Sequence, residues 1–417
     1  MKAEKPIQWI ANSHAHPGVP GGLTTEFFSR ELPRRIRGFH REIPGYKMSP
    51  LKGLPILAER LGLGGIWVKD ESARLNLGSF KVLGGSYAIY QRLKQRLGLQ
   101  GQDIPLSEML SGAMREKLGP ITFAAATDGN HGRGVAWSAT RMGFESIIYV
   151  HKLTSRQRIE AIEYNGGKVV IIDGNYDDAV RQVYQDAQRN GWEVISDTSW
   201  EGYEDVPKWV MQGYTTLLSE TQEQLSGQGL SRPTHVFVQA GVGSLAAATL
   251  GFYATLLGED RPRSVVVEPT KAACLYESMR ADDGKPHSVG GDLDTIMAGL
   301  ACGDPNPLAW EILRDCADYF AVCPDYVAAK GMRVYGVPIH GDPFIISGES
   351  GAVTLGALMY VMEYKGAAAL REGLALGPQS QVLLINSEGN TSPDDFRNVV
   401  WEGGNPVPEE YKVYPTP

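Results

Sequence analysis

The feature that most constrains the fold is a regular alternation of short apolar runs with longer amphipathic segments. Runs typical of strands lie at 65–69, 121–126, 146–150, 168–172, 234–238, 264–268 and 381–386. Segments typical of helices lie at 56–58, 83–97, 132–142, 156–165, 177–190, 209–223 and 245–257. Because parallel strands need a crossover between them, this order predicts parallel sheets covered by helices on both faces.

The length of the chain sets the scale of this α/β fold. Its 417 residues, 42% of them hydrophobic, can bury a large core and predict two domains. Residues up to about 50 are rich in Gly, Pro and Arg, and predict an irregular arm of short helices and strands over that core. The segment 245–257 is apolar on nearly all sides, which places it at the centre of a domain.

Charge and composition exclude several classes of partner. A net charge of −8 argues against nucleic acid or a membrane surface. No apolar run approaches the roughly 20 residues that span a bilayer, and the first residues lead into no apolar signal core. The four cysteines form no C-x-x-C pair and the eight histidines no H-E-x-x-H, so we predict no metal site. We expect a cytoplasmic enzyme that acts on a small molecule.

Lys81 is the first candidate for chemistry. It lies between glycine-rich flanks, just after an apolar strand, in the segment Gly78-Ser79-Phe80-Lys81-Val82-Leu83-Gly84-Gly85. A lysine amine forms a Schiff base with a carbonyl cofactor when its surroundings favour the neutral form. A single lysine is more often a solvated surface charge, so other motifs have to support this assignment.

A second candidate is the glycine turn that follows the strand at 234–238. Gly241, Gly243 and the helix start at Ser244 would offer free backbone N–H groups and a helix dipole to a phosphate. A structural turn or a dinucleotide site would use the same glycines, and Glu268 lies at a tolerable distance for the latter. Lys81 and the absence of a further dinucleotide signature disfavour that site.

Polar residues follow the strand at 121–126, where α/β proteins place their ligands. Asp128 and Asn130 are expected to point into a cleft there, although either could simply cap the next helix. The same alternative holds for the segments 197–203 and 347–352.

Five segments, taken in order, resemble the fold-type II pyridoxal-phosphate enzymes, which include the serine and threonine dehydratases and the tryptophan synthase β subunit. They lie at 79–85, 128–132, 241–245, 349–352 and 386–390. The details are most similar to the diaminopropionate ammonia-lyases, since dehydratases usually have Ser-x-Gly-Asn-His where this chain has Thr127-Asp128-Gly129-Asn130-His131, with the carboxylate of Asp128 as the departure. Segments 197–203 and 297–303 also resemble those lyases.

The resemblance implies two three-layer α/β/α domains with mostly parallel sheets, and pyridoxal 5′-phosphate in the cleft between them. The large cofactor-binding domain would be discontinuous, 1–85 plus 210–417, and the small domain would be 86–209. Lys81 would carry the cofactor, Phe80 would pack beside its ring, Asn130 would bond its phenolic oxygen and Ser387 would face its pyridine nitrogen. Its phosphate would be held by the backbone of Gly241, Val242, Gly243, Ser244 and Leu245.

The implied reaction is α,β-elimination of 2,3-diaminopropionate to pyruvate and two ammonia. Lys81 and Asp128 would be bases on opposite faces, so that both D- and L-isomers react, and Asp197 would be a further catalytic acid that binds the distal amine. Thr127 and Ser350 would help the two aspartates bind substrate, with the Ser350 segment at either the carboxylate side or a cation site. Cys274 and Cys302 would lie near the cleft mouth, as thiols or as a disulfide. A homodimer is expected by analogy.

Other functions stay open at this point. A serine or threonine dehydratase would share most of these motifs, as would a relative that binds cofactor or amino acid without turnover. A nicotinamide-dependent dehydrogenase would rest on the Gly241 turn alone.

Overall fold

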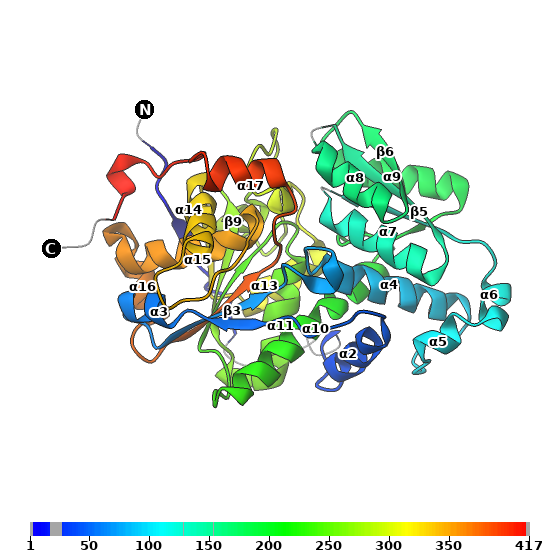
Figure 1. Ribbon diagram of the computed structural model, residues 1–417, viewed down its shortest axis with the longest axis horizontal. Coiled ribbons are helices and arrows are strands. Elements are labelled where there is room, and N and C mark those ends of the chain that lie inside the picture. The colour runs from blue at the N-terminus through cyan, green and yellow to red at the C-terminus, as the bar shows by residue number, and fades with distance from the viewer. Residues whose placement is uncertain (1–2, 17–26, 128, 153, 414–417) are drawn as a thin grey trace.

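The computed structural model describes residues 3–16, 27–127, 129–152 and 154–413, which form two sheet-centred units lying side by side (Figure 1). The larger sheet has seven strands, and its inner five are parallel. The two edge strands run antiparallel to their neighbours. In spatial order the strands are β1 (Gln8–Ala11), β10 (Tyr319–Cys323), β9 (Arg263–Pro269), β8 (His235–Gln239), β11 (Gln381–Asn386), β3 (Gly65–Asp70) and β2 (Leu51–Gly53).

Helices cover both faces of this sheet. On one face pack α10 (Asp205–Gly227), α11 (Ser244–Leu257) and α13 (Pro307–Cys316). On the other pack α14 (Asp325–Gly336) and α15 (Glu349–Glu363). Every residue of β8 is buried, as expected for a strand covered on two sides. Residues 244–254 of α11 are buried as well, which confirms its predicted central place.

The smaller sheet has four parallel strands in the order β6 (Gly167–Ile172), β5 (Glu145–His151), β4 (Thr122–Thr127) and β7 (Glu193–Val194). Helices α7 (Asn130–Met142) and α8 (Arg156–Tyr164) pack on one face, and α9 (Tyr176–Asn190) on the other. Each unit is therefore an α/β/α sandwich, and the predicted α/β fold with mostly parallel sheets is confirmed.

One helix joins the units. Helix α4 (Lys81–Arg96) contacts both α7 and α10. Both predicted domain boundaries, after residues 85 and 209, fall inside α4 and α10 rather than in loops, and the division of the chain stays a prediction.

The N-terminal arm is more regular than expected, with β1 in the sheet and α2 (Leu32–Glu42) against α10 and α4. The remaining elements are α3 (Pro55–Arg60), η1 (Arg74–Asn76), α5 (Leu106–Met109), α6 (Gly112–Leu118), η2 (Gly258–Asp260), α12 (Cys274–Ala281), η3 (Ala298–Leu300), η4 (Lys365–Ala367), α16 (Ala368–Leu374), α17 (Pro393–Val400) and η5 (Glu409–Tyr411). Among the described helices, none has the length and apolar character needed to cross a membrane.

A buried ionic cluster fixes the segment that leads to Lys81. Lys69 at the end of β3 and Arg74 in η1 both pair with Glu220 of α10, with N–O distances of 2.7 and 2.6 Å. Arg74 also pairs with Glu71 at 2.7 Å. All four side chains are fully buried, so the turn before α4 is anchored to the interior of the larger unit.

Candidate active site

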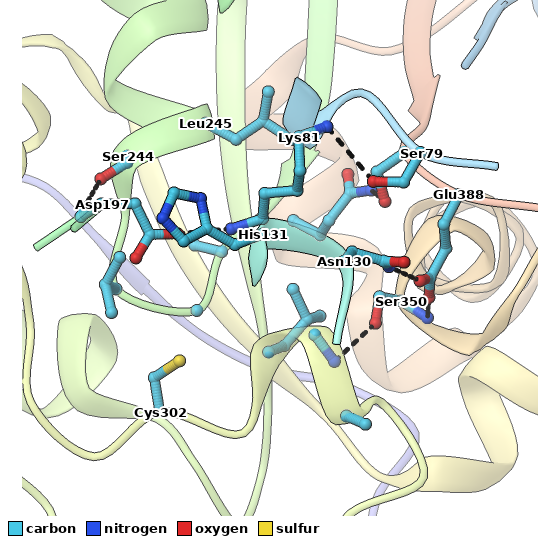
Figure 2. A pocket seen from close by; sticks show the side chains of 18 of the residues that line it. Ser79, Lys81, Asn130, His131, Asp197, Ser244, Leu245, Cys302, Ser350 and Glu388 are labelled. Atoms are coloured by element: carbon cyan, nitrogen blue, oxygen red, sulfur yellow. Dashed lines mark hydrogen bonds and ion pairs between the residues drawn. The ribbon is translucent and has the colours of Figure 1, made fainter. Parts of the chain in front are cut away.

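Lys81 is the first residue of α4 and faces a cavity between the two units (Figure 2). Its Nζ lies 2.6 Å from the Asp197 Oδ2 atom and 5.7 Å from the centre of the Phe80 ring. The Phe80 ring in turn packs edge-on against Tyr214. The backbone N–H of Phe80 donates to the Ser387 carbonyl at 3.2 Å, which ties the lysine segment to the end of β11.

Asp197 follows β7 and is only 3% exposed. Besides the lysine, its carboxylate accepts a 3.0 Å hydrogen bond from the Tyr176 hydroxyl. Burial alone would raise the pKa of Asp197, but Lys81, His131 and the Tyr176 hydroxyl lower it well below its usual range. The cavity therefore holds a charged carboxylate next to the lysine amine.

The glycine turn after β8 leads into the N-terminus of α11. Gly243 has φ +102°, a conformation that suits glycine, and a Cβ there would also lie 3.2 Å from the Leu313 Cδ1 atom. The first N–H groups of a helix have no intrahelical acceptor, so this end can bind an anion. Glu268 is not placed to contact a ribose, because its carboxylate accepts the backbone N–H groups of Leu275 and Tyr276 at 2.9 and 2.7 Å.

Ser244 connects this turn to Asp197. Its hydroxyl donates to the Asp197 carbonyl at 2.6 Å, and the Asn306 amide donates to both oxygens, at 2.9 Å to Ser244 and 3.1 Å to Asp197. The anion-binding turn and the loop carrying the carboxylate are therefore held together.

Ser387 and Asn130 lie on the other side of the cavity. The Ser387 hydroxyl follows β11 and accepts a 2.8 Å hydrogen bond from the Gln239 amide. Asn130 begins α7, and its Nδ2 donates to Glu388 at 2.5 Å. Ser350, at the start of α15, accepts the Gly299 N–H at 3.2 Å.

The space between the lining side chains amounts to about 710 Å³, including space open to solvent. Most of the predicted site residues line it. They are Phe80, Lys81, Asn130, Asp197, Gly241, Val242, Gly243, Ser244, Leu245, Ser350 and Ser387.

Two predicted site residues are not among the lining residues. Thr127 is fully buried, and its Oγ1 accepts the N–H groups of Gly129 and Gly132 at 2.8 and 3.0 Å. Its hydroxyl shapes the turn before α7, because it bonds the backbone there rather than facing the cavity. Asp128 lies outside the described residues.

Other lining residues had no predicted role. They include Ser79, His131, Tyr176, Gln239 and Glu388. His131 and Glu388 lie inside motif segments and could have been proposed from that position, whereas Tyr176 is marked by nothing except the start of a helix. Cys302 also lines the cavity, as expected of a residue near the cleft, and within the described residues neither it nor Cys274 forms a disulfide.

This set of groups fits pyridoxal phosphate. The cavity offers an amine for the aldehyde, a helix N-terminus for the phosphate, a hydroxyl at the end of β11 and an amide on α7. An aromatic ring beside the lysine adds an apolar surface. Among the described residues, no group of three His, Cys, Asp or Glu side chains could hold a metal ion.

Comparisons with known proteins agree with this fit. The model of the pyridoxal-phosphate dependent enzyme family matches residues 43–388. The chain is 48% identical to the diaminopropionate ammonia-lyase of Escherichia coli strain K12 over 386 residues, 93% of this chain and 95% of that protein.

Two crystal structures of the Escherichia coli lyase are also similar, both at 44% sequence identity. One, in complex with D-serine, has a TM-score of 0.88, and the other, with an aminoacrylate-PLP azomethine reaction intermediate, has a TM-score of 0.85. Each comparison covers 96% of this chain and 98% of the other. The chain therefore belongs to the pyridoxal-phosphate-dependent enzymes and, within them, to the diaminopropionate ammonia-lyase family.

Proposed function

We propose that this chain catalyses the α,β-elimination of 2,3-diaminopropionate, from both the D- and the L-isomer, to pyruvate and two ammonia. The observation that carries the proposal is the paired Lys81 and Asp197, 2.6 Å apart in a cavity that also presents the N-terminus of α11. The similarity to the Escherichia coli lyase, which spans nearly the whole chain, supports the same reaction.

Bound pyridoxal phosphate would withdraw electrons from the α-carbon of the amino acid and so make its α-proton acidic. Lys81 supplies the amine that carries the cofactor, and once released by substrate that amine takes the α-proton. The α11 N-terminus would hold the phosphate, Ser387 would face the pyridine nitrogen and Asn130 would bond the phenolic oxygen. Because the Ser387 side chain is a neutral hydroxyl, it would not enforce protonation of that nitrogen, which would favour rapid loss of the β-substituent.

Two carboxylates are proposed to handle the second amine. Asp128, the carboxylate that the corresponding Ser-x-Gly-Asn-His motif of the dehydratases usually lacks, attracts the leaving ammonium and acts as the base for the isomer that Lys81 cannot reach. Asp197 binds the distal amine, and its low pKa supports this, because a charged carboxylate attracts an ammonium group. Ser350 lines the same cavity and binds the substrate carboxylate. The product aminoacrylate takes up water and releases the second ammonia.

The test is pyruvate release from each isomer separately, with serine and threonine as control substrates. Lys81→Ala is expected to lose both the visible absorbance of the bound cofactor and turnover. Asp128→Asn is expected to keep the absorbance but to lose turnover, most severely with the D-isomer. Unchanged D-isomer turnover in Asp128→Asn would discard the two-base assignment, and faster release from serine than from diaminopropionate would favour a dehydratase. Bound cofactor without release from any of them would favour a non-catalytic relative.

We also propose a homodimer that works in the cytoplasm, by analogy with the family. Light scattering on the purified holoenzyme measures the dimer directly, and fractionation of the producing cells tests the location.

A further inference from the structure

Glu388 is a buried carboxylate in the cavity wall that the reaction proposed above does not use. It is 2% exposed and follows Ser387 directly after β11. Its Oε2 accepts the Asn130 Nδ2 at 2.5 Å and the Thr391 hydroxyl at 3.3 Å. Its Oε1 accepts the backbone N–H of Ser350 at 3.2 Å (Figure 2).

These contacts join the two sheet units. Asn130 opens α7 over the smaller sheet, whereas Glu388 and Ser350 belong to the larger unit. The Glu388 backbone is itself held on both sides, by a bridge to Ser79 and by a 3.1 Å hydrogen bond from the Gly348 N–H. The carboxylate is therefore a fixed acceptor, and the Asn130 side chain is oriented against it.

Because the Asn130 amide is planar, its bond to Glu388 also determines where its second N–H group points. A side-chain amide carries two N–H groups in one plane, so an acceptor on one of them fixes the direction of the other. A carboxylate acceptor makes the bond charge-assisted and stronger than a neutral one. The Asn130 Oδ1 also accepts from Arg133, at 3.4 Å, so both ends of the amide are restrained.

We propose that Glu388 is a positioning residue that acts through Asn130, holding its amide so that the second N–H is presented to the cofactor. The proposal rests on the assignment of Asn130 to the phenolic oxygen made under the proposed function. It does not depend on which amino acid the enzyme consumes.

The test is a double-mutant cycle on cofactor binding, measured without substrate. Apoprotein is prepared from wild type, Glu388→Ala, Asn130→Ala and the double variant, and the pyridoxal phosphate dissociation constant is measured from the visible absorbance and circular dichroism. In the presence of Asn130, Glu388→Ala is expected to weaken binding about tenfold, the scale of one charge-assisted hydrogen bond. In the Asn130→Ala background it should have almost no effect. An equal loss in both backgrounds would overturn the proposal, because Glu388 would then act independently of Asn130.

Two further variants separate positioning from general disruption. Glu388→Gln keeps the shape and an acceptor oxygen and should restore most of the affinity. Glu388→Met keeps the length of the side chain but removes the acceptor, and it replaces Glu388→Ala in the cycle if the alanine variant does not fold. Thr391→Ala removes a hydroxyl, which is the second side-chain donor to the same carboxylate oxygen, and should change affinity by less than about twofold. A larger loss for Thr391→Ala than for Glu388→Ala would refute the role of the Asn130 contact. Failure to release pyruvate from diaminopropionate would refute the proposed reaction and leave the binding result intact.

Discussion

Replacing Glu220 with Gln should destabilise the larger unit strongly, because it removes one of the two anions in a fully buried ionic cluster. The Glu220 carboxylate contacts Lys69, Arg74 and the Tyr46 hydroxyl, at 2.7, 2.6 and 2.5 Å. Two cations and two anions balance in the native cluster, with Glu71 as the second anion. After the substitution, Glu71 alone would have to compensate both Lys69 and Arg74, and a net positive charge would stay buried.

The magnitude follows from the pKa of the carboxyl group. Burial opposes ionisation, but Arg74 and Lys69 outweigh it and lower the pKa of Glu220 from 4.5 to about 2. At about 1.4 kcal/mol per pKa unit, this corresponds to about 3 kcal/mol of stability at neutral pH. Removing one partner of a buried pair typically costs about 3 to 5 kcal/mol, so the two figures agree. Because the pKa of Glu220 is lower in the folded protein, its carboxylate contributes this stability above pH 4.5, and the contribution is lost as the pH falls towards 2.

The assay is denaturant-induced unfolding of the wild type and Glu220→Gln at pH 7 and again near pH 4. We expect a cost of about 3 kcal/mol at pH 7 and a smaller cost at the lower pH. The matched control is Glu145→Gln, which removes an exposed ion pair with Lys168 and should cost less than about 1 kcal/mol. Adding Lys69→Met to Glu220→Gln removes one uncompensated cation and should recover part of the loss. A cost no larger than that of Glu145→Gln, or one independent of pH, would refute the reasoning.

Two further predictions concern stability. Burial and the neighbouring Glu388 raise the pKa of Glu349 from 4.5 to about 8, so its contribution is present below pH 4.5 and is lost as the pH rises through 8. This carboxyl group should lower the free energy of unfolding of the wild type by up to about 1.4 kcal/mol per pH unit between pH 5 and 8. Glu349→Gln should therefore show a smaller fall in melting temperature over that range, and parallel melting-temperature curves for the two proteins would contradict this. Gly132→Ala should cost about 1 to 3 kcal/mol in denaturant, because its Cβ would lie 2.4 Å from both Ile148 Cγ2 and Thr127 Cγ2. Gly38→Ala is the control: it lies inside α2 with nothing near the new atom and should be neutral or stabilising, and an equal loss in both would contradict the packing argument.

Seven of the nine parallel strands that the structure describes were predicted within about one residue, because strands buried on both faces are continuous apolar runs bounded by polar turns. The segment 381–386 matches β11 at both ends, and 264–268 differs from β9 by one residue at each end. The strands β7 and β10 were not predicted. β7 has only two residues, too few to form an apolar run. For β10 the reason is different. Its five residues, Tyr319–Cys323, follow a helix closely, and a short apolar run there is ambiguous between strand and buried helix.

The candidate site was predictable wherever its residues lie in glycine-rich turns at the ends of strands. Lys81 and the Gly241–Gly243 turn belong to this class, since local sequence alone marks them. Tyr176 donates to Asp197 from the first turn of α9, and only the packing of that helix against the smaller sheet brings the two together. Contacts that depend on such packing leave no pattern in the sequence.

Asp197 links the two halves of the site. Its side chain pairs with Lys81, while its carbonyl accepts the Ser244 hydroxyl at the start of α11. A shift of the loop after β7 would therefore change both the charge beside the lysine and the helix end that can bind a phosphate. The Asn306 amide bonds both the Ser244 hydroxyl and the same carbonyl, so two donors of the larger unit hold this one oxygen of the loop. The geometry of the lysine and that of the anion-binding turn are thus set by one residue of the smaller unit.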